Sequence, residues 1–231
     1  MKTLEYRMFL PLLVVVVSLL ATTLHAQAPL QSSRILTLDG DDWLIATDAD
    51  NVGRMEKWWR APRAGARRTH VPGLLDEVFP DYRGVVWYWC NFKATANPHT
   101  DGRNLLRFWS VDYKADVWFN DIFLGTREAG GIPFEFDVTN LLKPGQSNFV
   151  SVRVPRPGEA RIDDMVLGEV PSRGHGGITD SVQFLMVPPV RIEDLHVRPD
   201  APGGRCDCAI QQYTSGTDYR DRRDRPGRCN P

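Results

Sequence analysis

Between residues 35 and 197 the chain is built from short apolar runs, separated by clusters of Gly, Pro, Asn and Asp. Within these runs apolar and polar residues alternate, as where Val150 and Val152 surround Ser151 and are followed by Arg153. A period of two places alternate side chains on opposite faces of a strand, so we expect one face to be buried and the other to be wet. The pattern predicts an all-β fold, a sandwich or a barrel.

The same alternation predicts a β-hairpin near the middle of the chain. Val117 and Phe119 alternate with Asp116 and Trp118, and the pair at residues 120–121, Asn-Asp, separates this run from the apolar run that follows. Asn and Asp tolerate the left-handed backbone of a tight turn. Two antiparallel strands joined by this turn are therefore expected.

Residues 1–28 have the pattern of a signal peptide. Lys2 and Arg7 give a positive start, residues 8–20 form an apolar run, and residues 26–28 (Ala-Gln-Ala) suit a signal peptidase. The apolar run is shorter than the roughly 20 residues of a membrane-spanning helix, although an uncleaved membrane anchor is the alternative. Export predicts a periplasmic or extracellular location, and no stable membrane span is expected.

Composition changes abruptly near residue 200. From there to residue 231 large aliphatic residues nearly vanish, while Arg, Asp, Gly and Cys dominate. Such a segment buries too little apolar surface to offset the entropy of ordering it. It is either a naturally disordered end or the product of a shifted reading frame, and the Arg/Asp run at residues 220–225 favours the second. The predicted division is a signal peptide (1–28), a β-sandwich domain (29–199) and this tail (200–231).

Several function classes have no support in the sequence. The formal net charge is −1, with 28 basic and 29 acidic residues, so no nucleic-acid partner is expected. The histidines lack metal-ligand spacing, and Cys206-x-Cys208 alone is weak evidence for zinc, so no metal is predicted. No cofactor is predicted either, because neither a P-loop nor a dinucleotide fingerprint occurs. Cys90, inside an aromatic strand-like run, is expected to be a small buried apolar residue.

Seven motifs follow one another in order along the predicted domain: Leu38-Asp39-Gly40-Asp41-Asp42-Trp43, Val71-Pro72-Gly73, Gly84-Val85-Val86-Trp87-Tyr88, Ala115-Asp116-Val117-Trp118-Phe119-Asn120, Gly130-Gly131-Ile132-Pro133-Phe134, Phe136-Asp137-Val138-Thr139 and Gly176-Gly177-Ile178-Thr179-Asp180-Ser181-Val182. This series resembles the N-terminal sugar-binding domain of family 2 glycoside hydrolases, the group of β-galactosidases, β-glucuronidases and β-mannosidases. The resemblance covers residues 35–197 and implies an antiparallel β-sandwich, a jelly roll of the galactose-binding-domain-like type.

The chain departs from the family pattern in places. The family often has Asn-Gly where this chain has Asn120-Asp121, and often has His near the position of Glu128. The matching loop of relatives, at residues 161–175 here, can reach toward the active site, but its residues vary too much for roles to be carried over.

The resemblance also implies which chemistry this chain lacks. Glycoside hydrolysis uses two carboxyl groups that flank one bond, and in the family both are glutamates on a later (β/α)₈ barrel. An immunoglobulin-like domain and that barrel are the partners that the resemblance implies, beyond this chain. We therefore assign no catalytic residue and expect the chain alone to be inactive. A free-standing carbohydrate-binding module and a protein-interaction sandwich are the alternatives.

A carbohydrate partner would need an aromatic face for the apolar side of a pyranose ring, and carboxylate or amide groups for its hydroxyls. The candidate residues are Trp58, Trp59 and Trp109 for the first and Asp163, Asp164 and Asp180 for the second. The alternatives are a partly buried loop or strand for the Trp pair and solvated loop charge for the aspartates. Trp43, Trp87 and Phe134 are expected to fill the core instead.

Overall fold

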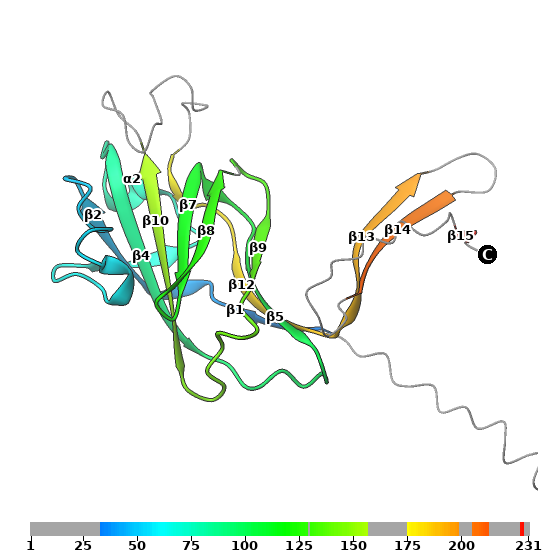
Figure 1. Ribbon diagram of the computed structural model, residues 1–231. Coiled ribbons are helices and arrows are strands. Elements are labelled where there is room, and N and C mark those ends of the chain that lie inside the picture. The colour runs from blue at the N-terminus through cyan, green and yellow to red at the C-terminus, as the bar shows by residue number, and fades with distance from the viewer. Residues whose placement is uncertain (1–32, 129, 157–174, 199–204, 213–226, 229–231) are drawn as a thin grey trace, which may run out of the picture. The chain divides into compact units, whose positions relative to one another are not determined.

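The structure, a computed structural model, describes residues 33–128, 130–156, 175–198, 205–212 and 227–228 (Figure 1). Within these residues it is almost entirely built of antiparallel strands, which confirms the predicted all-β fold. No helix among them is long and apolar enough to cross a membrane. The predicted signal peptide, Asp163 and Asp164 lie outside the described residues.

Two sheets form the sandwich, and Figure 1 shows them as two layers. The smaller has the strand order β1-β12-β5-β9, and the larger has the order β3-β2-β4-β10-β7-β8. The four strands of the smaller sheet are β1 (Arg34–Thr37), β12 (Val182–Val187), β5 (Arg103–Phe108) and β9 (Phe134–Asp137). The six strands of the larger sheet are β3 (Arg67–Val71), β2 (Gly40–Asp48), β4 (Gly84–Lys93), β10 (Ser147–Arg156), β7 (Lys114–Phe119) and β8 (Ile122–Glu128).

Short elements complete the sandwich. A 3₁₀ helix, η1 (Trp58–Arg60), lies between β2 and β3, and a single-turn helix, α2 (Leu75–Val78), lies between β3 and β4. A two-residue pair joins β6 (Val111–Asp112) to β11 (Gly177–Ile178).

The main core fills the space between the two sheets. Trp43 is fully buried there, and its indole Nε1 donates a hydrogen bond to the Leu38 carbonyl at 2.7 Å. The ring of Phe92 contacts Phe119 of its own sheet at 6.0 Å and Phe184 of the opposite sheet at 5.2 Å between centroids. The alternation along β10 is explained by this core, because its valines point into it. Cys90 is also buried in this core, as predicted.

The predicted hairpin is confirmed between β7 and β8. Asn120 and Asp121 have φ values of 47° and 72°, the left-handed conformation that these residue types tolerate. The Asn120 side chain adds a specific reason for its place, because its Nδ2 donates to the Leu141 carbonyl at 2.8 Å and its Oδ1 accepts from the Phe149 amide at 2.9 Å.

The expectation that one face of β10 is wet is wrong. Ser151 and Arg153 point away from the main core, yet both are fully buried. Residues 49–66, which we call the covering segment, run from β2 to β3 and pack η1 onto β10. Trp87 is buried as expected, but under this segment with Trp58, while Phe134 is half-buried. A loop thus forms a third layer on the outer face of the larger sheet.

A separate three-stranded sheet has the order β13-β14-β15, from β13 (Val190–Arg198), β14 (Arg205–Gln212) and β15 (Gly227–Arg228). Composition indicated no regular structure beyond residue 200, whereas β14 pairs with β13 over its whole length. The reason for the difference is that ladder hydrogen bonds join backbone groups, which composition does not report. The division of the chain at residue 200 and its origin in a shifted frame stay predictions.

Candidate functional site

A strip of aromatic rings crosses the outer face of the larger sheet. We use the name aromatic strip for Trp59, Trp87, Trp118 and Phe123. Trp87 and Trp118 have centroids 5.2 Å apart, Trp59 lies parallel on Trp118 at 5.6 Å with 6° between the rings, and Phe123 lies 5.0 Å from Trp118. The strip runs from fully buried Trp87 to Phe123, which is 51% exposed.

The strand register explains how the strip forms. Trp87 lies on β4 and Trp118 on β7, at positions whose side chains point away from the main core. The register of β7 and β8 shifts between Val117 and Trp118, and this irregularity places Phe123 directly opposite Trp118. Trp59 comes from η1 and completes the strip from above the sheet. Trp118 covers one face of the Trp59 ring. Because Trp59 is only partly buried, its exposed surface belongs to the other face and the ring edges.

Two side chains of the sheet hold η1 in place through its backbone. The Trp89 indole Nε1 donates to the Trp58 carbonyl at 2.7 Å, and the Ser151 hydroxyl donates to the Trp59 carbonyl at 2.9 Å. The buried donors are thereby satisfied, which the burial of polar groups requires. The backbone of Trp59 is consequently held by the sheet, in addition to the stacking of its ring on Trp118.

Asp48, at the end of β2, fixes the start of the covering segment. Its carboxylate accepts from the Val52 amide at 2.8 Å, the Gly53 amide at 2.9 Å and the Trp87 indole at 2.9 Å. A Cβ at Gly53 would lie 2.4 Å from the Trp87 Nε1, so only glycine permits this close approach. Asp48 is therefore committed to structural bonds.

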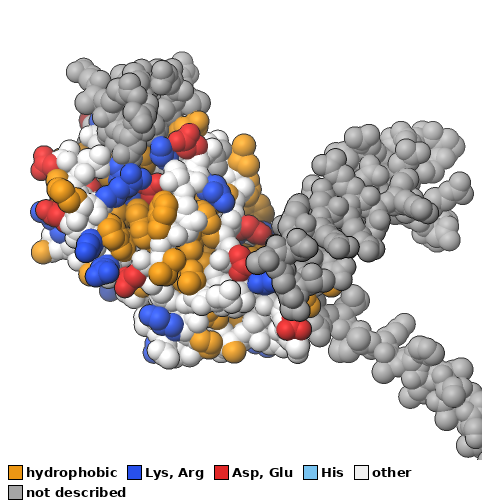
Figure 2. Space-filling model, viewed as in Figure 1, with side chains coloured by type: hydrophobic (Ala, Val, Ile, Leu, Met, Phe, Trp, Pro, Cys, Tyr) orange, Lys and Arg blue, Asp and Glu red, His pale blue; other side chains and the backbone are white. Residues whose placement is uncertain are grey.

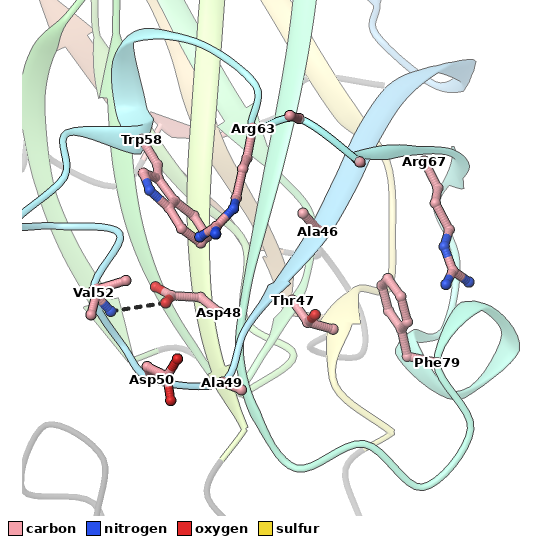
Figure 3. A pocket seen from close by; sticks show the side chains of 12 residues that line it. Ala46, Thr47, Asp48, Ala49, Asp50, Val52, Trp58, Arg63, Arg67 and Phe79 are labelled. Atoms are coloured by element: carbon pink, nitrogen blue, oxygen red, sulfur yellow. Dashed lines mark hydrogen bonds between the residues drawn. The ribbon is translucent and has the colours of Figure 1, made fainter.

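A hollow of about 330 Å³ lies beside η1 (Figure 3). Its polar lining includes Asp48, Asp50 and Arg63. The Arg63 guanidinium lies 4.4 Å above the centroid of the Trp58 ring, and the Trp58 Nε1 donates to Glu56 at 2.9 Å. Trp58 is thus buried with its ring already engaged, and the hollow offers charged groups rather than an open aromatic face.

The other predicted sugar-binding residues lie in a different place. Trp109 follows β5 and is 39% exposed, and the Arg107 guanidinium lies 5.9 Å from its ring centroid. Asp180 is exposed, and its Oδ1 accepts from the Ser181 amide at 2.7 Å. The Trp109 amide donates to the Ser181 carbonyl at 2.9 Å, so the structure brings Trp109 and Asp180 to the same end of the neighbouring strands β5 and β12. It does not bring them to Trp58 and Trp59, and sugar binding by all of these residues stays a prediction.

Sequence reasoning missed a charged cluster around α2. Arg156 donates two hydrogen bonds to the Asp76 carboxylate, from Nη1 to Oδ1 at 2.5 Å and from Nη2 to Oδ2 at 3.0 Å, and the His175 Nδ1 lies 3.4 Å from Oδ2. The hydrogen bonds from Arg156 hold the pKa of Asp76 below its ordinary value of 3.8. Since 80 residues separate this pair, no local signal could have indicated it. Among the described residues no cluster of three or more His, Cys, Asp or Glu could hold a metal ion.

Residues 35–188 match the family model described as glycosyl hydrolases family 2, sugar binding domain. The chain belongs to this family. This family 2 sugar-binding domain is 32% identical over 117 residues to a β-glucuronidase from Paenibacillus borealis, an alignment that covers 48% of this chain and 20% of the relative. It is 30% identical over 124 residues to a β-galactosidase from Thermoanaerobacter pseudethanolicus, which covers 50% of this chain and 16% of that protein.

Solved structures show the same fold. A β-glucuronidase from Ruminococcus gnavus in complex with D-glucuronic acid superposes with a TM-score of 0.64 at 21% identity, over 79% of this chain and 35% of that one. The family 2 sugar-binding domain therefore has the sandwich that the motif series implied. It spans a fifth or less of the length of the two curated relatives named above.

Proposed function

We propose that this domain is the N-terminal part of an exported β-glycosidase that releases terminal β-linked sugars, with β-glucuronides as the first substrates to test. The observation that carries the proposal is the family match over residues 35–188. The choice of sugar is supported by the relatives named β-glucuronidase, which include one from Formosa agariphila that is 43% identical over 75 residues, covering 32% of this chain and 7% of that protein. The pattern of residues 1–28 supports export.

In this proposal the domain supports the enzyme and does not cleave the bond. Hydrolysis needs two carboxyl groups free to act on one glycosidic oxygen and carbon. Asp48 accepts three hydrogen bonds from the covering segment and β4, and Asp76 is paired with Arg156. The acid and the nucleophile are accordingly expected in an (β/α)₈ barrel outside this chain, preceded by an immunoglobulin-like domain.

Hydrolysis of 4-nitrophenyl β-glucuronide, β-galactoside and β-mannoside tests the proposal. The purified chain should release no nitrophenol, whereas the product of the full coding region, with the reading frame restored where it is shifted, should act on one of the three. Sequencing the DNA downstream of codon 231 should show the two further domains in one of the three frames. Turnover by the chain alone, or the absence of that coding sequence, would contradict the proposal.

A free-standing carbohydrate-binding module is the second candidate. It is favoured by the half-exposed Trp109 and by Asp180, an aromatic residue and a carboxylate residue at the same end of β5 and β12. Calorimetric titration of the chain with a galactoside, a glucuronide and a mannoside separates the two candidates. Heat that saturates, and is lost in Trp109→Ala, supports the module, and the absence of heat at millimolar sugar removes it.

A further inference from the structure

Positive charge is concentrated on one stretch of a chain that is otherwise nearly neutral. Residues 54–68 hold six basic side chains and one acidic side chain, although the whole chain has a formal net charge of −1. All six basic residues are exposed: Arg54, Lys57, Arg60, Arg63, Arg67 and Arg68. Arg54 is paired with buried Asp116, while Arg63 and Arg68 make exposed contacts with Glu56 at 3.9 Å and Asp42 at 3.7 Å, which water screens. The excess that remains attracts anions over about a Debye length, roughly 8–10 Å at physiological ionic strength.

This basic stretch contributes to the aromatic strip. Arg60 directly follows Trp59 in η1, so a guanidinium and a stacking ring come from neighbouring positions. Figure 2 shows hydrophobic side chains gathered on this face of the molecule, with Lys and Arg side chains at their margin. Phe123 contributes a half-exposed ring whose centroid lies 5.0 Å from that of Trp118. Rings and cations therefore share one surface.

The surface formed by the aromatic strip and the basic stretch is preorganised by hydrogen bonds. The carbonyls of Trp58 and Trp59 are bonded to the sheet, and Asp48 fixes the start of the covering segment. A ligand that binds there has little backbone to order, which lowers the entropic cost of binding.

We propose that this surface binds an acidic polysaccharide, with pyranose rings stacked on Trp59 and Phe123 and uronate carboxylates paired with Arg60 and Arg63. Charge complementarity selects the acidic class, because guanidinium groups bind carboxylates through paired hydrogen bonds. Aromatic faces suit the apolar side of a sugar ring. The choice of a glycan over another polyanion rests on the proposed function, and it is also favoured by the lack of a basic excess in the chain as a whole.

Binding of two matched oligosaccharides to the full chain tests the proposal. One probe is a β-1,4-linked glucuronic acid oligomer, and the other is the neutral cello-oligosaccharide of the same length. Calorimetry should detect the acidic oligomer alone, with an affinity that falls as salt is added. Trp59→Ala, and separately the double variant Arg60→Ala with Arg63→Ala, should each raise the Kd by about tenfold or more.

Control variants at exposed positions of the smaller sheet distinguish this surface from other binding sites. Arg34→Ala and Ile35→Ala change exposed residues of the smaller sheet and should leave the Kd within about twofold. Phe123→Ala repeats the aromatic test at a half-exposed position if Trp59→Ala fails to fold. The proposal is overturned by no binding, by equal binding of the neutral oligomer, by loss of binding in Trp109→Ala, or by duplex DNA that binds as tightly as the acidic oligomer. None of these results affects the proposed glycosidase function, which hydrolysis assays decide.

Discussion

Arg153 and Asp116 form an ion pair with no exposed side-chain surface on either partner, with 2.9 Å between the Arg153 Nη1 and the Asp116 Oδ2. Asp116 also accepts hydrogen bonds from Arg54 and, at 2.6 Å, from the Thr126 hydroxyl. The Arg153 Nη2 donates to the Asn51 Oδ1 at 2.6 Å. Because a buried charge is costly unless it is paired, this network ties the covering segment to β10, β7 and β8.

The two partners of this pair should respond differently to replacement. Asp116→Ala removes the carboxylate that pairs with the buried Arg153 guanidinium and should lower the free energy of unfolding by about 3–5 kcal/mol. Arg153→Met should cost less, because Asp116 keeps Arg54 and Thr126. Urea denaturation of both variants measures the difference, with Arg34→Met as an exposed control expected within about 0.5 kcal/mol of the wild type. Equal losses would show that the two remaining contacts do not compensate.

Gly177 should be among the most sensitive glycines to substitution. Its φ of +107° lies in the region that favours glycine, and an added Cβ would lie 2.8 Å from the Tyr88 hydroxyl and 3.1 Å from the Gly73 carbonyl oxygen. Left-handed strain alone costs a non-glycine residue roughly 1–2 kcal/mol. Because the new Cβ is also crowded, Gly177→Ala should destabilise the domain by about 2 kcal/mol or more. Gly145→Ala is the matched control, since φ is +72° there and nothing lies within 4 Å of the new Cβ. Thermal unfolding should show a larger loss at Gly177, and an equal loss would rule out the crowding.

Asp76 should make stability depend on pH in the acid range. Its pKa is lowered by the hydrogen bonds from Arg156, so its charged form is stabilised in the folded state. The stabilisation is fully present above the ordinary value of 3.8 and is lost as the pH falls through the lower folded pKa. The difference in unfolding free energy between the wild type and Asp76→Asn should thus be largest near neutral pH and shrink in acid.

Urea titrations at several pH values measure that difference. Arg156→Gln removes the cause of the shift, so Asp76→Asn should have a much weaker pH dependence in that background. The same dependence in both backgrounds would show that Arg156 is not the cause.

Cys90 should be protected from alkylation in the folded domain. Burial raises the pKa of its thiol to about 12, and the thiolate is the reactive form. Iodoacetamide at about pH 8 should leave Cys90 unmodified until urea unfolds the domain, as located by mass spectrometry of its peptide. Rapid labelling in native buffer would show that this part of β4 opens.

Alternation in the sequence was enough to predict the inner face of the sandwich. Val150 and Val152 point into the main core as a period of two requires, and the hairpin at Asn120 and Asp121 follows from residue types that accept a positive φ. These features are local, so a short window of sequence contains the physical cause.

The same alternation failed on the outer face, where it treated Ser151 and Arg153 as wet. A strand's period separates two faces but does not say what covers each of them. The cover is a loop about a hundred residues earlier in the chain, joined through the Trp59 carbonyl and the Asn51 side chain. The candidate site was only partly predictable for the same reason. The sequence indicated Trp59 as a candidate aromatic face for a sugar, but its stacking on Trp118 depends on a contact between residues far apart in the chain.

The side chains of Trp89 and Ser151 attach η1 to the sheet by hydrogen bonds to two of the carbonyl oxygens of η1. Every amino acid has such an oxygen, so this attachment is indifferent to the side chain at position 59. A library randomised at Trp59, Arg60 and Arg63 should consequently yield many folded members that display new chemistry on an unchanged frame. The covering segment would then be a natural starting point for directed evolution of altered ligand preference, much as antibody engineers vary a loop on a constant sandwich.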